Sequence, residues 1–331
     1  MITAVVYAES GGAYKTTYTA NLGVAFSRMG LDVLVVDLDP QAACLSALFE
    51  VDHRKDDSEV DNLVRHLLEM PEGDFSDLIE SAEGIDILPC HDMYSDFTSK
   101  LEQKIAYETG MKNIDRDEYP RYQLMYDLFW EQEKLQNQYD VILIDPNARA
   151  EDLLYNALYA MRTLVSPIEP SGKGSLSIDG LGKMVENMQR ELDIEIGLAC
   201  VIPTNVGANN SSEVYKNQIV ESDEYPTSVT IGKRESLMKA MWDVNGSAFE
   251  VVEGRWQIEK GGADSESSVE QGSRRVRDRE VETLKKLYEI ADFIATDAFG
   301  VQVDPTLELD IDGRETQTYN VSEGEPMEET A

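Results

Sequence analysis

Long apolar runs and basic residues are scarce in this chain of 331 residues. No run of about 18 uncharged apolar residues is present, which excludes a candidate transmembrane helix. The N-terminal residues 1–7 lack a basic region and a cleavage site, so no secretory signal is predicted. We therefore expect a cytoplasmic protein.

Cysteine and histidine are also rare, with three of each. The cysteines are too widely spaced for a disulfide framework or a CxxC metal site, so we expect buried reduced thiols. The histidines are scattered through an acidic region and are predicted to lie on the surface. No serine, histidine or cysteine constellation indicates nucleophilic catalysis, and no acceptor pocket for small-molecule kinase or synthetase chemistry can be identified. The residues concerned are Cys44, Cys90, Cys200, His53, His66 and His91.

Acidic residues dominate the charge. Asp and Glu number 64 against 29 Lys and Arg, which gives a net charge of −35, whereas small soluble domains commonly carry about 2–8 charges. Residues 51–100 hold fourteen acids and four bases, and 301–331 hold nine acids and one Arg. An acidic interaction tail and mimicry of nucleic acid are alternatives, but the spread of the acids favours a surface adapted to a cytosol of high salt.

Buried strands alternate with helical patterns. Apolar runs predict strands at 2–8, 33–36, 85–88, 141–144, 164–168 and 198–202, and runs without alternation suit a parallel sheet covered on both faces. The predicted fold is therefore α/β, a doubly wound, mostly parallel sheet flanked by helices.

One domain over residues 1–300 is predicted. Within it we expect an acidic, mostly helical insert at 51–137 on the sheet's edge, a loop or linker at 254–272, and a C-terminal helix at 273–298 that packs onto the sheet. Residues 301–331 read as an acidic, disordered tail.

A glycine-bearing turn separates the first strand from the first helix. Backbone N–H groups at such a helix start point at an anion, and Gly11 and Gly12 allow close approach. Lys15 supplies positive charge near the β- and γ-phosphates, and the Thr16 hydroxyl can complete Mg²⁺ coordination. The strict GxxxxGK[ST] pattern fails, however, because Glu9 and Tyr14 replace its two glycines. An ordinary polar turn is the alternative for this segment taken alone.

Two later segments favour the phosphate loop. Asp39 and Asp145 each follow a predicted buried strand, and such positions face the ligand crevice of a doubly wound sheet. Asp145 is placed to hold Mg²⁺ directly or through water. Asp39 is placed to orient an attacking water.

With these segments the sequence resembles the ParA/MinD-type P-loop ATPases with a deviant Walker A box, nearest the chromosome- and plasmid-partition branch. The resemblance implies a homodimer that clasps two ATP, slow Mg²⁺-dependent hydrolysis stimulated by a ParB-like or cargo-adaptor protein, and ATP-gated binding to nonspecific DNA of the nucleoid. The nucleotide-binding residues that it implies are Gly11, Gly12, Ala13, Tyr14, Lys15, Thr16 and Thr17. The matching segments are residues 11–17, 21–22, 37–41, 145–146, 156–158 and 168–171.

Two residues depart from the family pattern. The signature lysine that reaches the partner's phosphates is replaced by Ser10, and Lys173 is our candidate substitute. Tyr14 stands where the family has glycine, which crowds the loop or shifts its backbone. Both departures also permit the alternative function of a nucleotide-binding adaptor or regulator with little hydrolysis.

A basic cluster near the predicted C-terminal helix is the candidate DNA contact. It comprises Arg274, Arg275, Arg277 and Arg279. Pairing of these arginines with neighbouring acids along the helix is the equally weighted alternative. Membrane attachment is disfavoured because the tail is acidic rather than basic and amphipathic.

Overall fold

The computed structural model describes most of the chain. Described residues are 1–8, 14–112, 115–147, 149, 151–169, 174–206, 214, 217, 219–221, 225–227, 229–254, 257–260, 268–271, 276–311 and 316–321, with the backbone alone at 174–181, 257–260 and 268–271.

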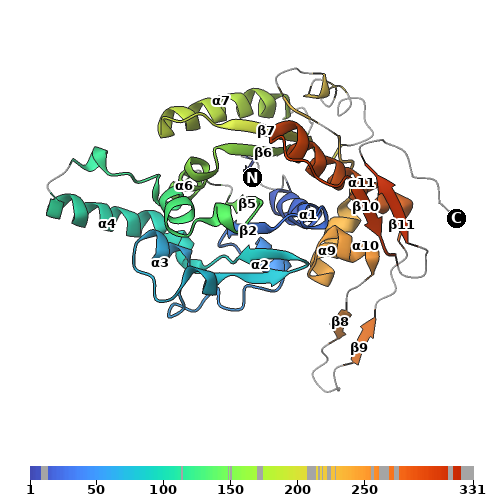
Figure 1. Cartoon of the computed structure of the whole chain (residues 1–331), viewed down its shortest axis with the longest axis horizontal. Coiled ribbons are helices and arrows are strands. Elements are labelled where there is room, and N and C mark those ends of the chain that lie inside the picture. Colours follow the sequence, from blue (N-terminus) through green and yellow to red (C-terminus); the bar gives the residue numbers. More distant parts are fainter. Residues whose placement is uncertain are drawn as a thin grey trace.

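A seven-stranded sheet in the order β3-β4-β2-β5-β1-β6-β7 forms the centre of the molecule (Figure 1). All neighbouring strands pair in parallel except β3, which is antiparallel to β4. The six strands predicted from apolar runs are present, and the doubly wound parallel fold is confirmed. The short, polar β3 gave no apolar signal. The strands are β1 (Ile2–Val6), β2 (Val33–Leu38), β3 (Glu80–Ala82), β4 (Ile85–Leu88), β5 (Val141–Pro146), β6 (Thr163–Ile168) and β7 (Gly197–Pro203).

Helices cover both faces of the sheet. Along β2, Val33 and Val35 join one hydrophobic cluster while Leu34 and Val36 join the other, which explains why this strand is continuously apolar. The first face carries α1 (Lys15–Arg28), α2 (Leu45–Leu48), α9 (Glu235–Val244), α10 (Ala248–Glu253) and α11 (Asp278–Phe293). The second carries α3 (Leu63–Leu67), α4 (Phe97–Lys112), α5 (Leu124–Tyr126), α6 (Asp152–Met161) and α7 (Gly174–Leu192).

Helix α1 lies directly on the sheet. A Cβ at Gly23 would come within 2.9 Å of the Val35 side chain, so only glycine permits this close approach. Gly30, with φ +85°, follows the end of the helix in the left-handed conformation. Asn21 ties α1 to α10 because its side-chain oxygen accepts a 2.9 Å hydrogen bond from the Ala248 N–H. This buried hydrogen bond fixes the middle of α1 against the start of α10.

The acidic segment 51–137 lies at the sheet's edge, as expected, but it is less helical than expected. It supplies β3 and β4 as well as α3, α4 and α5. The other helical pieces of this segment are short turns, and each has too few apolar positions to give a periodic signal in the sequence. These turns are Phe75–Leu78, Asp92–Asp96, Arg116–Glu118, Asp127–Gln132 and Leu135–Asn137.

The C-terminal part contains more strand than the sequence indicated. Within the expected linker, β8 (Gln257–Lys260) pairs with β9 (Ser268–Gln271). The predicted helix is α11, followed by the helical turn Ile294–Ala298.

The expected disordered tail was wrong for residues 301–311 and 316–321. Here β10 (Thr306–Leu309) pairs antiparallel with β11 (Gln317–Asn320). Leu307, Leu309 and Ile311 are buried in the same core as α11, and this apolar alternation outweighs the acidic composition. Residues 322–331 lie outside the described part of the chain.

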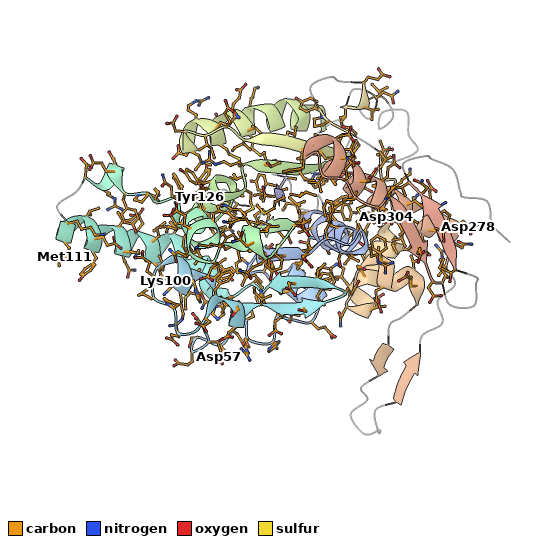
Figure 2. The ribbon with its side chains drawn as sticks, in the orientation of Figure 1. Asp57, Lys100, Met111, Tyr126, Asp278 and Asp304 are labelled. Carbon is orange, nitrogen blue, oxygen red and sulfur yellow. The ribbon has the colours of Figure 1, made fainter. Side chains whose placement is uncertain are left out.

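Side chains are distributed over the whole ribbon in Figure 2, with Met111 near the tip of the protruding α4. Among the described helices, none combines the length and apolar character needed to cross a bilayer.

Candidate functional site: the carboxyl edge of the sheet

The segment after β1 leads into α1 at Tyr14. Tyr14 has φ 58° and ψ 28°, the left-handed conformation that glycine adopts without strain. Its half-buried side chain packs against the core on the α1 face. Tyr14 therefore stands in a backbone conformation that suits a glycine better than a tyrosine.

Lys15 and Thr16 open α1 and lie near two acids. Burial lowers the pKa of Lys15, and the negative charges of Asp145 and Asp39 oppose that shift. The four residues thus lie close enough to interact, as the sequence predicted, because α1 begins at the edge where β2 and β5 end. The arrangement puts one cation and one hydroxyl beside two carboxylates.

Asp145 is completely buried at the end of β5. Burial and then the charge of Asp37 raise its pKa well above the ordinary value, while the Thr16 hydroxyl and Lys15 oppose the rise. Its Oδ2 atom is buried and has no hydrogen-bond partner within the described residues. A buried carboxylate oxygen without a partner, next to a threonine hydroxyl, fits a hard cation with oxygen ligands such as Mg²⁺.

Thr19 is a neighbour of Asp145 that the sequence reasoning missed. Its hydroxyl donates a 3.0 Å hydrogen bond to the Lys15 carbonyl and lies 3.5 Å from Asp145 Oδ1. Position 19 is one helical turn after Lys15, so it shares the lysine's face of the helix. This four-residue spacing is the feature of the sequence from which Thr19 could have been predicted.

Asp37 holds the segment that carries Asp39. The Asp39 N–H donates to Asp37 Oδ1 at 3.0 Å, and the Ser46 N–H donates to Asp37 Oδ2 at 2.7 Å. Burial raises the pKa of Asp37, and the hydrogen bonds from Ser46, Asp39 and Cys44 oppose the rise. Asp39 itself is half-buried, and its Oδ1 accepts from the Gln41 N–H at 3.0 Å. Asp37, to which the sequence gave no separate role, is thus a positioning residue.

A second unpartnered oxygen lies at the end of β7. Asn205 donates a 2.9 Å hydrogen bond to Glu169 Oε1, whereas its own Oδ1 is buried without a partner among the described residues. Close by, the Tyr18 hydroxyl donates to Thr204 Oγ1 at 2.6 Å. Asn205 was not predicted as a site residue, because an isolated asparagine after a strand is an ordinary turn residue.

Several predicted residues lie outside the described part of the chain. The described residues of the predicted anion-binding segment are Tyr14, Lys15, Thr16 and Thr17, the last of which is buried. The predictions that fall on undescribed positions concern Ser10, Gly11, Gly12, Ala13, Lys173, Arg274 and Arg275.

The remaining basic cluster stands at the start of α11. Arg277 and Arg279 are exposed there, and the Arg277 N–H donates to Glu280 Oε2 at 3.0 Å. Two nearby lysines have partners within the chain: Lys285 Nζ lies 3.7 Å from the Tyr319 ring centre, and Lys286 donates to the Thr230 carbonyl. The two arginines are therefore exposed to solvent, whereas Lys285 contacts the C-terminal strand β11 and Lys286 ties α11 to the segment before α9.

The expectation that all three histidines are surface residues was wrong for two of them. His66 is buried and lies 2.9 Å from Asp61 Oδ2. His91 is buried and accepts a hydrogen bond from the Met93 N–H. Inside the fold both imidazole rings have polar partners, which could not be recognised from the sequence.

Comparison with known proteins agrees with this geometry. The family model described as "CobQ/CobB/MinD/ParA nucleotide binding domain" matches residues 4–242. The chain is 26% identical over 198 residues to the chromosome-partitioning ATPase Soj of Thermus thermophilus, over 59% of this chain and 66% of that protein.

Two solved structures are similar in fold. A Cyanothece McdA variant in complex with ATP has a TM-score of 0.63 and 18% identity, covering 91% of this chain and 97% of the other. A putative plasmid partition protein of Borrelia burgdorferi bound to AMPPNP has a TM-score of 0.59 and 18% identity, covering 90% and 100%. At such identities the likeness is one of fold. The family match extends over more than half of the chain, and the protein therefore belongs to the CobQ/CobB/MinD/ParA nucleotide-binding family.

Proposed function

We propose that this protein is a Mg·ATP-dependent dimerisation switch that hydrolyses ATP slowly and positions DNA or another cargo in the cytoplasm. Lys15 contacts the phosphates, Thr16 and Asp145 hold Mg²⁺, and Asp39 orients the attacking water. Residues 11–17 form the anion-binding backbone. A ParB-like or cargo-adaptor protein stimulates hydrolysis. When bound, Mg²⁺ neutralises charge on the phosphates during transfer.

The buried Oδ2 of Asp145, which has no hydrogen-bond partner among the described residues and lies beside Thr16 and Lys15, is the observation that carries this proposal. Burying a carboxylate oxygen without a hydrogen-bond partner lowers the stability of the fold unless a cation binds to that oxygen. Asn205, which follows β7, adds support, because its buried carboxamide oxygen can accept a hydrogen bond from the amino group of a base. The partition proteins among the relatives favour the cargo-positioning role.

Single-turnover hydrolysis of ATP in molar KCl tests the enzyme. We expect Asp39→Ala to lower the rate by about 100-fold with ATP still bound, and Lys15→Ala to weaken binding as well. Asp56→Ala removes an exposed acid and serves as the matched control. Equal background rates of hydrolysis in all four proteins would contradict the proposed ATPase activity.

Dimerisation is tested by light scattering with ATP or ADP in the same buffer. We propose that Lys173 supplies the charge that Ser10 cannot. Lys173→Ala should leave the protein monomeric with ATP, whereas Lys183→Ala, which removes an exposed lysine from α7, should dimerise normally. A Lys173→Ala protein that dimerises and hydrolyses ATP like the wild type contradicts this role.

DNA is the first cargo to test. Arg277 and Arg279 are exposed and together with Arg274 and Arg275 would contact phosphates. Replacing Arg277 and Arg279 by Gln should weaken ATP-dependent DNA binding and reduce the salt slope by about two. The pair Lys183→Gln and Arg190→Gln removes the same charge from α7 and should change neither. Equal losses in both double variants would show that only net charge matters.

An adaptor that binds nucleotide with little hydrolysis is the second candidate. Tyr14 favours it, because a bulky residue in a left-handed position of the phosphate loop restricts how that loop closes. ATP-dependent dimerisation without measurable turnover, unaffected by Asp39→Ala, would select the adaptor.

A further inference from the structure

Cys44 and Cys90 are in contact although 46 positions separate them in the sequence. Their Sγ atoms lie 3.1 Å apart, and both side chains are buried. Cys44 immediately precedes α2, and Cys90 lies two residues beyond β4. The parallel pairing of β2 with β4 brings the two segments to the same edge of the sheet. The ATPase roles proposed above involve neither thiol.

A positive charge lies beside this pair. Lys55 Nζ is 3.7 Å from Cys44 Sγ and is held there by the carbonyl of Gln41. The Asp37 carboxyl group also adjoins the pair and accepts a hydrogen bond from the Cys44 thiol. The hydrogen bond between the sulfurs, and then burial, raise the pKa of the Cys90 thiol. Either thiol can donate the hydrogen bond that joins the two sulfurs.

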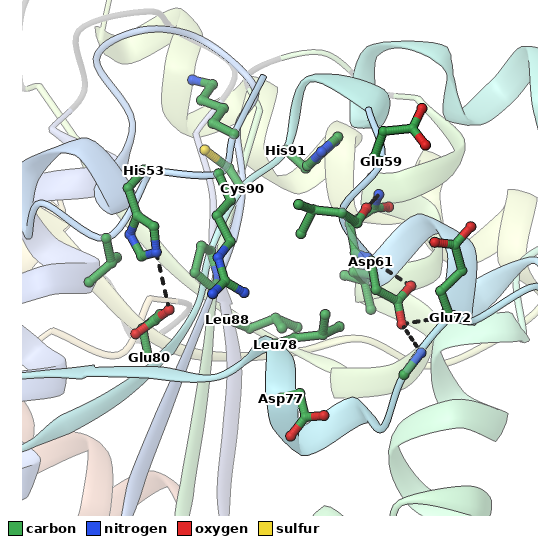
Figure 3. A pocket seen from close by; sticks show the side chains of 18 of the residues that line it. His53, Glu59, Asp61, Glu72, Asp77, Leu78, Glu80, Leu88, Cys90 and His91 are labelled. Carbon is green, nitrogen blue, oxygen red and sulfur yellow. Dashed lines mark hydrogen bonds and ion pairs between the residues drawn. The ribbon is translucent and has the colours of Figure 1, made fainter. Parts of the chain in front are cut away.

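A cavity reaches one of the two cysteines, Cys90. Its volume is about 300 Å³, and its lining includes Lys55, Cys90 and His91. Figure 3 shows Cys90 and His91 on its wall, opposite Asp61 and Glu72. A peroxide is far smaller than this volume and can reach the Cys90 sulfur.

A bound metal ion is the alternative use of the pair. Asp37, Cys44 and Cys90 offer ligand atoms within 4.8 Å of one another, all of them buried. The Asp37 oxygens, however, already accept hydrogen bonds from Asp39 and Ser46. Lys55 also places a positive charge 3.7 Å from Cys44 Sγ, which disfavours a cation on that sulfur. The surroundings thus favour oxidation of the thiols over metal binding.

We propose that Cys44 and Cys90 are an oxidation site, at which a peroxide forms a disulfide that fixes the segment carrying Asp39. The Cys90 sulfur, which the peroxide reaches, takes one peroxide oxygen as the O–O bond breaks and hydroxide leaves. The Cys44 sulfur then attacks the Cys90 sulfur, so that the S–S bond forms, the S–O bond breaks and a second hydroxide leaves. The two thiol protons convert both hydroxides to water, and the two electrons pass to the peroxide.

The disulfide acts on hydrolysis through Asp37 and Ser46, an effect that rests on the function proposed above. Closing the sulfurs from 3.1 Å to about 2.05 Å pulls Cys44 toward Cys90. Ser46, two residues after Cys44, donates to Asp37 and accepts a 2.9 Å hydrogen bond from the Cys90 N–H. The segment from Asp37 to Ser46 is then tied at both ends. Lys15 and Thr16 belong to α1, so the nucleotide stays bound.

The full chain, treated with hydrogen peroxide in molar KCl, then unfolded in denaturant and alkylated, tests the site, because all three cysteines are buried in the folded chain. We expect an intact mass lower by two hydrogens, alkylation at Cys200 alone, and a peptide linking Cys44 to Cys90. Single-turnover hydrolysis should fall at least about fivefold with ATP affinity within about twofold, and a reducing thiol should restore the rate. Cys90→Ser should be insensitive to peroxide, whereas Cys200→Ser should respond as the wild type does.

Three results would overturn the proposal. Alkylation of all three cysteines after peroxide excludes the disulfide, and stoichiometric zinc that survives dialysis assigns the pair to a metal. A disulfide that leaves the rate unchanged overturns the control of hydrolysis. A reduced wild type without ATPase activity contradicts the proposed function instead, and the mass of the oxidised chain still decides whether the disulfide forms.

Discussion

Asp145 on β5 lies directly opposite Asp37 on β2, so two buried carboxyl groups are neighbours at the carboxyl edge of the sheet. Burial raises the pKa of both carboxyl groups, and the charge of Asp37 raises the pKa of Asp145 further. Lys15 is a partial counter-charge. The site thus stores unfavourable electrostatic energy that a bound cation would relieve.

Asp145→Asn is the direct test of that relationship. We expect the nucleotide-free variant to melt about 2–4 °C higher than the wild type, because one desolvated charge is removed. The same variant should lose the extra stabilisation that Mg·ATP gives the wild type. Thermal melts with and without Mg·ATP measure both effects, and Asp56→Asn is the control. A lower melting temperature without nucleotide would contradict the electrostatic argument.

Tyr14 allows the backbone strain at the start of α1 to be measured. Its φ of 58° costs an L-residue about 1 kcal/mol relative to glycine. Tyr14→Gly and Tyr14→Ala both remove the ring and differ only in the Cβ. We expect Tyr14→Gly to be the more stable of the two by about 1 kcal/mol in urea unfolding at fixed KCl. Equal stability would mean that the left-handed conformation is not strained.

Glu83 should make stability depend on pH. It accepts hydrogen bonds from the N–H and hydroxyl of Ser247, and burial raises its pKa above the ordinary 4.5 while those bonds oppose the rise. Because the folded state holds this proton more tightly, Glu83 favours folding below pH 4.5. The benefit is lost as pH rises through the folded-state value.

Glu83→Gln should therefore gain stability relative to the wild type as pH rises from about 4.5 to 8. Urea unfolding of both proteins across that range measures the difference. Glu59→Gln, at an exposed position, should show no such trend. A difference that is flat with pH would show that Glu83 titrates alike in the folded and unfolded chain.

The sequence predicted what depends on local pattern and missed what depends on strand order. Apolar runs identified β2 and β5, and their ends identified Asp39 and Asp145. The opposition of Asp37 to Asp145 requires β2 and β5 to be neighbours, and the contact of Cys44 with Cys90 requires β2 beside β4. No local pattern contains that information. The segment 301–311 was missed for another reason: acidic composition concealed the alternation of Leu307, Leu309 and Ile311.

The net charge of −35 predicts a fold that needs salt. Mutual repulsion of the acids opposes compaction in dilute buffer, and the Debye length falls to about 3 Å at 1 M salt. We expect the melting temperature to rise steeply up to about 1 M KCl. Sucrose stabilises by exclusion without screening, so at matched osmolality it should give a smaller rise. Equal melting temperatures in dilute buffer and in molar KCl would exclude adaptation to a salty cytosol and leave the acidic surface to be explained by a partner.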